Sequence, residues 1–408
     1  MRRRTEHSVH GRTPRRRATF AVATAVVAAV TVAALPGGGG TVASAAAPTR
    51  GGGRVDLETP IFSDPTSITN PLFPRDTVTQ VVQLGVEGGD DLRFEITYLP
   101  ETKFIRWNGR RVETRVTHFV AYMNGRILEV ATDFYAQADD GAVWYFGENV
   151  DNYDNGVIVD HEGTWLAGRD GPPGMIMPGD PQVGDVFRPE NIPGLVFEQV
   201  TVRRTGFTVA GPRGPVSGAI AVRERLMDGT TEDKQYAPGY GEFRAEVATE
   251  AELYHVAVAS PVDSLGTSVP RALRALDEGA EKVFELAPSR RWHQLSGIAD
   301  RMSATWTHYR TRSVPALLDA QMTERLDLLD AAVARRRVAK VRQAAIDAAH
   351  AVLDLQMQFR GRNAVDRDRL DLWRLQLVID RAAGDAAAVA GDLATIETIK
   401  DRRGSGCC

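Results

Sequence analysis

The chain has 408 residues, of which 43% are hydrophobic and 25% are charged. These proportions are those of a globular protein and exclude a collagen-like, coiled-coil or wholly disordered chain, and the length indicates two or three domains. The first 47 residues contain seven of the 49 basic side chains and one of the 53 acidic ones, which leaves 42 basic and 52 acidic side chains in the rest. An acidic body argues against nucleic acid as the main partner, because phosphates are bound by basic surfaces.

Residues 1–47 predict a signal peptide. Seven arginines precede an uncharged apolar run, Phe20 to Leu35, and small residues follow that would permit cleavage after Ala45 or Ala47. The run is about 16 residues long, whereas a spanning helix needs about 20. We therefore expect a secreted or extracytoplasmic protein without a spanning membrane segment in the mature chain. The sequence leaves open whether export follows the Sec or the twin-arginine route. It also leaves open whether the signal peptide is cleaved or retained as a membrane anchor.

The only cysteines are Cys407 and Cys408. The body of the chain therefore has no disulfide, no zinc-thiolate site and no cysteine nucleophile. The terminal pair could cross-link two chains in an oxidising space or form part of a loose tail, residues 404–408. The oligomeric state stays open.

A flexible linker is expected over residues 48–60, and residues 61–260, here called the β half, have the pattern of short strands. Asn108-Gly109 and Asn124-Gly125 are strong hairpin signals, because both central residues of such turns need positive φ. The runs of β-branched and aromatic residues predict strands at Val78–Leu84, Leu92–Tyr98, Lys103–Trp107, Arg111–Val120, Arg126–Tyr135, Ala142–Phe146, Val196–Thr205, Phe207–Ala210, Ser217–Leu226 and Ala245–Val258. Because no long stretch with helical periodicity interrupts the β half, we predict a barrel-like antiparallel sheet, closed or strongly curved on itself.

Residues 268–403, here called the helical half, are rich in Ala, Leu, Arg and Asp. Apolar residues recur at helical spacing in three stretches, which are Leu318 to Val333, Val341 to Phe359 and Leu370 to Leu377. Short links between the stretches predict an antiparallel bundle of five or six helices. The expected fold class is α+β, an antiparallel β domain followed by an all-α bundle.

One acidic segment has some of the spacing of a calcium-binding loop. Counted from Asp151, Asn155 takes the fifth place and Glu162 the twelfth, with Asp160 between them. Tyr153 occupies the third place, where an oxygen ligand is wanted, and the flanks read as strands, so an EF-hand is not expected. The candidate metal ligands are Asp151, Asn155, Asp160 and Glu162, with Ca²⁺ as the cofactor. The alternative is a hairpin tip whose Asp and Asn residues serve the turn.

Aromatic residues gather in the same region. Tyr135, Trp144, Tyr145 and Trp165 are the candidate ligand-binding residues, if the curved sheet encloses a cleft. The alternative is that they form the β core, since aromatic side chains fit a half-buried pleated surface.

No phosphate-binding glycine loop, Gly-x-Ser-x-Gly elbow or His-Glu-x-x-His motif occurs, so no catalytic residue is assigned. Paired carboxylates among Asp133, Asp139 and Glu148 could in principle hydrolyse a glycosidic bond. A metal-handling bundle centred on His350 is a further alternative, although the Glu-x-x-His motif of metal-binding bundles is missing.

Several short motifs carry a resemblance to a known group of proteins. The pieces Tyr135-Ala136-Gln137 and Gly141 to Glu148, together with Asn70 to Pro74 and Tyr236 to Gly241, match a recurrent signature. The chain resembles a family of secreted bacterial proteins that carries this signature and has no assigned activity. The resemblance covers roughly residues 62–246 and implies no catalytic residues. The helical half looks like an addition seen in related actinobacterial exported proteins.

These observations predict an exported binding or cell-envelope protein without evident catalytic machinery, with calcium stabilising the β half as one option. The expected partner is an apolar, glycan or protein ligand of unknown identity. A secreted hydrolase with paired carboxylates and a metal-handling helical bundle are the alternatives.

Overall fold

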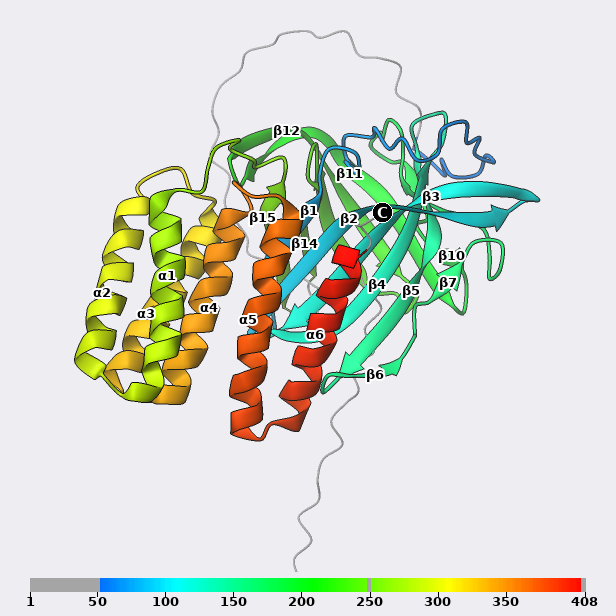
Figure 1. Ribbon diagram of the computed structural model, residues 1–408. Coiled ribbons are helices and arrows are strands. Elements are labelled where there is room, and N and C mark those ends of the chain that lie inside the picture. Colours follow the sequence, from blue (N-terminus) through cyan, green and yellow to red (C-terminus); the bar gives the residue numbers. More distant parts are fainter. Residues whose placement is uncertain (1–51, 248–250, 405–408) are drawn as a thin grey trace, which may run out of the picture.

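A computed structural model describes residues 52–247 and 251–404 of the chain. A large antiparallel sheet comes first and is followed by helices that lie on one side of it (Figure 1). The predicted α+β class, with its order of a sheet followed by helices, is confirmed. The predicted signal peptide, Cys407 and Cys408 lie outside the described residues.

The sheet of the described residues contains 15 strands in one hydrogen-bonded system. The strands are β1 (Gln80–Glu87), β2 (Asp90–Trp107), β3 (Arg110–Met123), β4 (Arg126–Gln137), β5 (Val143–Asp154), β6 (Val157–Asp160), β7 (Trp165–Leu166), β8 (Gly174–Met177), β9 (Val186–Phe187), β10 (Asn191–Ile192), β11 (Val196–Gly211), β12 (Gly214–Leu226), β13 (Thr231–Ala237), β14 (Gly241–Val247) and β15 (Glu252–Ser260). Their order is β10-β11-β12-β13-β14-β15-β1-β2-β3-β4-β5-β6, with β7 and β8 on β5 and β9 on β11. The pairing of β1 with β15 therefore joins two arms, β1–β6 and β10–β15, which curve toward one another.

The predicted strands have counterparts in the structure, but some are joined or divided differently, and β6 to β10 and β13 were not predicted. β2 and β11 are single strands where two were expected each time, and β14 and β15 are two strands where one was expected. The long β2 keeps its pairing with β3 across a register shift between Tyr98 and Thr102, which explains why its pattern looks interrupted. β13 was not predicted, because Glu232 and Lys234 occupy its buried positions and it shows no apolar alternation.

Six α-helices follow in the described part of the chain, as the spacing of apolar residues predicted. They are α1 (Arg271–Leu286), α2 (Trp292–Tyr309), α3 (Ala316–Ala334), α4 (Val338–Gln356), α5 (Arg362–Ala383) and α6 (Ala386–Gly404). The apolar core of the helices includes Val82 of β1 and Ala257 and Val258 of β15. The helical half therefore packs on the convex face of the sheet through a shared core and is not a separate bundle.

Charged side chains are buried between the sheet and the helices. Arg93 of β2 makes two hydrogen bonds to Asp354 of α4, at 2.6 and 2.8 Å. Glu95, two residues further along β2, accepts a hydrogen bond from Arg402 of α6 at 2.6 Å and lies 3.4 Å from Arg369 of α5. Two charged side chains on the helix-facing side of β2, Arg93 and Glu95, are therefore both paired.

The same arginines bind carboxylates of their own half. Arg369 donates to Asp354 at 2.7 Å, and Arg402 makes two hydrogen bonds to Asp366 of α5, at 3.0 and 2.6 Å. Arg402 and Asp366 are fully buried. We call these six residues the interface ion network, and it consists of Arg93, Glu95, Asp354, Asp366, Arg369 and Arg402.

The variant Asp366→Ala is expected to destabilise the protein strongly. The substitution removes both hydrogen bonds that the Arg402 guanidinium donates to Asp366. A buried guanidinium is then incompletely paired, which costs about 3–5 kcal/mol of stability. The free energy of unfolding in urea measures the loss. Glu278→Ala, at an exposed site of α1, is the control and should change it by less than about 0.5 kcal/mol. Equal effects of the two variants would show that the network contributes nothing to stability.

Candidate ligand cavity

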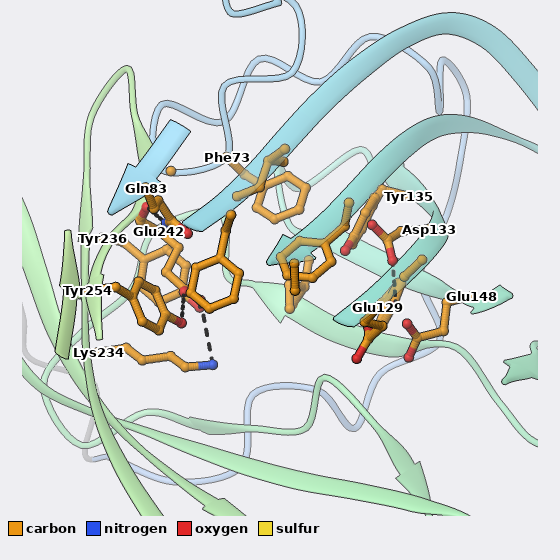
Figure 2. A pocket seen from close by; sticks show the side chains of 18 of the residues that line it. Phe73, Gln83, Glu129, Asp133, Tyr135, Glu148, Lys234, Tyr236, Glu242 and Tyr254 are labelled. Atoms are coloured by element: carbon orange, nitrogen blue, oxygen red, sulfur yellow. Dashed lines mark hydrogen bonds and ion pairs between the residues drawn. The ribbon is translucent and has the colours of Figure 1, made fainter. Parts of the chain in front are cut away.

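The concave face of the sheet encloses a cavity of about 210 Å³. Its walls come from both arms of the sheet, so residues far apart in sequence face each other across it (Figure 2). Rings and carboxylates dominate the lining, and two cationic side chains, Arg75 and Lys234, join them.

The strand alternation sorts side chains between this cavity and the helices. On β2, Phe94, Ile96 and Tyr98 line the cavity, whereas Arg93 and Glu95 point to the helical half. Successive side chains of a strand lie on opposite faces, so one strand serves both the cavity and the interface ion network. On β4, Glu129, Ala131, Asp133 and Tyr135 line the cavity at every second position.

A bulge in β5 brings two more functional groups to the cavity. Tyr145 and Glu148 both line it although they are three residues apart, which regular alternation does not allow. The register of β4 with β5 shifts between the pairs Asp133–Glu148 and Tyr135–Tyr145. Gly147 adopts a φ of 111° at this shift, and a side chain there would collide with the Trp165 carbonyl oxygen. The glycine thus permits the bulge that aims Tyr145 and Glu148 inward.

The segment before β1 closes one side of the cavity. The side-chain amide of Asn70 donates to the carbonyl oxygens of Gly141 and Pro178 at 3.1 and 3.0 Å, which fixes this segment on the sheet. Arg75 then lies over the rings of Phe73, Tyr98 and Tyr135, 4.3 to 4.4 Å from their centres, and donates a hydrogen bond to Thr117.

One end of the cavity contains a fully paired cation. The ammonium nitrogen of Lys234 lies 2.6 Å from Glu224, 3.1 Å from Glu232 and 3.5 Å from Glu242. Tyr254 donates to Glu242 at 2.6 Å. Burial disfavours the charge of Lys234, but the three carboxylates outweigh burial and hold its pKa above the ordinary value.

The opposite end is acidic. Glu129, Asp133 and Glu148 gather there (Figure 2), and Glu190 also lines the cavity. All four are at least nine-tenths buried, and none forms an ion pair with a described residue. Asp133 accepts a hydrogen bond from Tyr145 at 3.1 Å, and Glu190 accepts one from the Trp165 ring nitrogen at 2.8 Å. We call these four carboxylates the acidic end of the cavity.

Burial is the main cause of the altered pKa values at the acidic end. Burial and the neighbouring Asp133 raise the pKa of Glu129 to about 8. Burial raises the pKa of Asp133 to about 6, although Arg75 opposes the shift, and that of Glu190 to about 7. Burial and the charges of Glu190, Asp133 and Glu129 also raise the pKa of Glu148. Near neutral pH these carboxyls therefore share protons, which is unusual for acids at a protein surface.

The predicted ligand-binding aromatics divide into two pairs. Tyr135 and Tyr145 line the cavity and stack on each other at 4.7 Å between ring centres. Trp144 and Trp165 are buried in the core beside it, and Trp165 packs edge-on against Tyr145 at 5.4 Å. Trp165 thus supports Tyr145 and Glu190 from behind without lining the cavity.

The predicted calcium ligands lie on the β5–β6 hairpin, away from the cavity. Asp151 is 2.8 Å from His161, Asn155 donates to Asp154, and Asp160 accepts from Asn152 at 2.7 Å. The backbone nitrogen of Glu162 donates to Asp160 as well. Across residues 52–247 and 251–404, no group of three or more His, Cys, Asp or Glu side chains is placed to hold a metal ion.

The tip of this hairpin contacts the helical half. Gly156, with a φ of 76°, lies so close to α6 that an added Cβ would be 2.0 Å from the backbone nitrogen of Gly391. The tip of the predicted loop therefore packs against the last helix.

The other predicted residues occupy separate places. Asp139 accepts hydrogen bonds from Ser63 at 2.8 Å in an exposed turn and does not join Asp133 and Glu148. His350 is half-buried on α4 with its ring 5.5 Å from that of Trp373, and its removal from water lowers its pKa to about 4.

Sequence reasoning missed most of the cavity. Arg75, Glu129, Glu190, Lys234 and Glu242 were not singled out, because none of them belongs to a sequence motif with a known chemical role. Strand alternation could have pointed to Glu129 and Lys234, because residues i, i+2 and i+4 of a strand lie on one face. These positions are Glu129, Ala131 and Asp133 in β4 and Glu232, Lys234 and Tyr236 in β13.

Comparisons with known proteins add no relative. No protein-family model, curated protein or solved structure matches the chain. The resemblance noted in the sequence therefore stays a prediction. Within the described residues no helix is long and apolar enough to cross a membrane.

The raised pKa of Glu129 predicts how stability depends on pH. In the unfolded chain this carboxyl ionises near its ordinary pKa of about 4.3, whereas the folded protein keeps the proton up to about pH 8. The stability gained from that proton is fully present below about pH 4 and is lost as the pH rises to 8. The buried His118 and the half-buried His350, whose pKa values are lowered, act in the opposite direction only below about pH 6.5.

The midpoint of thermal unfolding is therefore expected to fall between about pH 6.5 and 8. Glu129→Gln keeps the shape but cannot ionise, so its midpoint should fall less steeply. Glu278→Gln, at an exposed site, is the control and should follow the wild type. A wild-type midpoint that is constant in this range would contradict the buried protonated carboxyls.

Proposed function

We propose that this chain is an exported, extracytoplasmic binding protein that holds a small organic ligand in the cavity of its β half. The observation that carries the proposal is the acidic end of this cavity, where four buried carboxylates have no ion pair with a described residue. Export rests on the predicted signal peptide.

The composition and size of the cavity support ligand binding. Ligand sites are typically concave, with aromatic and apolar walls and a few polar groups that orient the ligand. An apolar cavity of about 150 Å³ already accommodates benzene, and this cavity measures about 210 Å³. A protein whose only need was stability would gain from replacing these carboxylates with apolar side chains, because burying polar groups costs free energy.

A cavity-filling variant tests the proposal. Ala131 is buried on β4 and lines the cavity, so Ala131→Leu should occupy part of the space. In a panel of small cationic, neutral and anionic organic compounds, at least one should raise the unfolding midpoint of the wild type. For a compound at 100 times its Kd, stabilisation is about 2.7 kcal/mol, and the rise should be several degrees.

The same compound should leave the midpoint of Ala131→Leu unchanged. The proposal fails if no compound acts on the wild type and Ala131→Leu is more stable than the wild type. The cavity would then be a packing defect.

A secreted hydrolase is the second candidate, and one observation favours it. Asp133 and Glu148 are direct cross-strand partners and both line the cavity. Directly opposite residues have Cβ atoms about 4.5–5.5 Å apart. Glycosidases place two carboxyl groups about 5–9.5 Å apart, one as a proton donor with a raised pKa and one as nucleophile or base. Glu148 fits the first role and Asp133 the second.

Release of nitrophenol from 4-nitrophenyl glycosides tests this alternative. If the pair is catalytic, Asp133→Asn and Glu148→Gln should each lower the rate at least about 100-fold. Asp139→Asn is the matched control, because Asp139 was predicted with them but lies outside the cavity. Wild-type protein that releases no nitrophenol, or activity that survives both substitutions, excludes the pair as catalysts for these substrates.

A further inference from the structure

The charges that line the cavity are strongly unbalanced. Nine carboxylate side chains and two cationic side chains contribute to its wall. Charges taken out of water are stable only when they are paired or neutralised by protons. A bound cation would therefore be most favourable beside carboxylates that have no cationic partner within the protein.

Both cations of the wall are already engaged elsewhere. Lys234 contacts three glutamates at the opposite end. Arg75 lies between three aromatic rings and donates to Thr117, and it acts on the charge of Asp133 without forming an ion pair with it. Neither side chain neutralises the acidic end.

Glu129 marks the position where a partner is missing from the protein. Only 2% of the residue is exposed, and its Oε1 atom has no hydrogen-bond partner among the described residues. It points into the cavity beside Asp133 and Glu148 (Figure 2). A buried oxygen without a partner costs about 1–3 kcal/mol, which a bound donor would recover.

The wall between the two ends is aromatic. Phe94 stacks on Phe119 at 5.6 Å between ring centres and meets Tyr254 edge-on at 4.7 Å. Ring faces attract cations and cover apolar carbon atoms, so this wall suits an organic ligand that carries a positive charge. A metal ion fits less well, because the described residues hold no group of three acidic, His or Cys side chains placed for one.

We propose that the ligand of the cavity is an organic amine, whose ammonium group binds the unpartnered carboxyl of Glu129 at the acidic end and whose carbon skeleton lies against Phe94, Phe119 and Tyr254. This inference rests on the proposed binding function and names its ligand class. Binding replaces the protons of the acidic end by the ammonium group, so the ligand and protons compete for the same oxygens.

Three probes of nearly equal shape test the ligand class, namely benzylammonium, benzyl alcohol and benzoate. Titration calorimetry with the full chain at pH 7.5 should give benzylammonium an affinity about tenfold or more above that of benzyl alcohol, as expected for a hydrogen bond to a charged group. Benzoate should not bind measurably. Benzylammonium binding should release protons, which changes the measured heat between buffers of different ionisation enthalpy.

Glu129→Gln tests the residue that the inference depends on. It should weaken benzylammonium binding about tenfold and leave benzyl alcohol binding unchanged. Because this variant is expected to be at least as stable as the wild type near neutral pH, lost binding would not reflect unfolding. Glu278→Gln on the exposed face of α1 is the matched control and should bind all probes as the wild type does.

The outcomes separate this inference from the proposed function. If benzyl alcohol binds as tightly as benzylammonium, or Glu129→Gln retains full affinity, the amine class is wrong while binding in the cavity stands. If benzylammonium does not bind, the inference is overturned, and the wider compound panel decides the binding function separately. If Ala131→Leu binds benzylammonium like the wild type, the probe lies outside the cavity and the inference is overturned, while the compound panel again decides the binding function.

Discussion

The buried ion pairs between β2 and the helices α4, α5 and α6 fix the arrangement of the whole molecule. Glu95 receives guanidinium groups from both α5 and α6, and Arg93 reaches Asp354 on α4. Buried charges tolerate no mismatch, since an unpaired one costs several kcal/mol, whereas apolar side chains can repack after a small shift. The apolar core shared by the helices with β1 and β15 supplies attraction, and the interface ion network restricts the helices to one register.

This constraint extends to the cavity because the same strands form both. Arg93 and Glu95 leave β2 toward the helices, and Phe94 and Ile96 leave it toward the cavity. The helices thus hold the convex face of the strands whose concave face carries the ligand wall. The opposite arm of the sheet, with Lys234 on β13, has no such support from the network, so the two walls of the cavity differ in how they are held.

The sequence allowed the fold class and the helices to be predicted because apolar spacing reports local structure directly. It failed at β13, where Lys234 and Glu232 are buried by partners on other strands, and at the junction inside β2, where a register shift disturbs the alternation. Only part of the candidate site could be predicted from the sequence. Tyr135 and Tyr145 line the cavity as expected for a ligand site, whereas Trp144, which neighbours Tyr145 on β5 and points to its other face, and Trp165 of β7 lie in the core. Arg75 and Glu190 reach the cavity only through long-range packing, for which a single sequence carries no signal.

The contact between Arg402 and Glu95 spans 307 positions of the chain, and Arg402 lies in the last turn of α6. During synthesis the residues of β2 leave the ribosome long before their partner exists. At about 5–20 residues per second, Glu95 waits at least about 15 seconds for Arg402 to be added. Throughout that interval the Glu95 carboxylate can pair only with Arg93 of its own strand and, once α5 has been made, with Arg369 of the interface ion network. The order of synthesis thus makes α6 the element that completes this network.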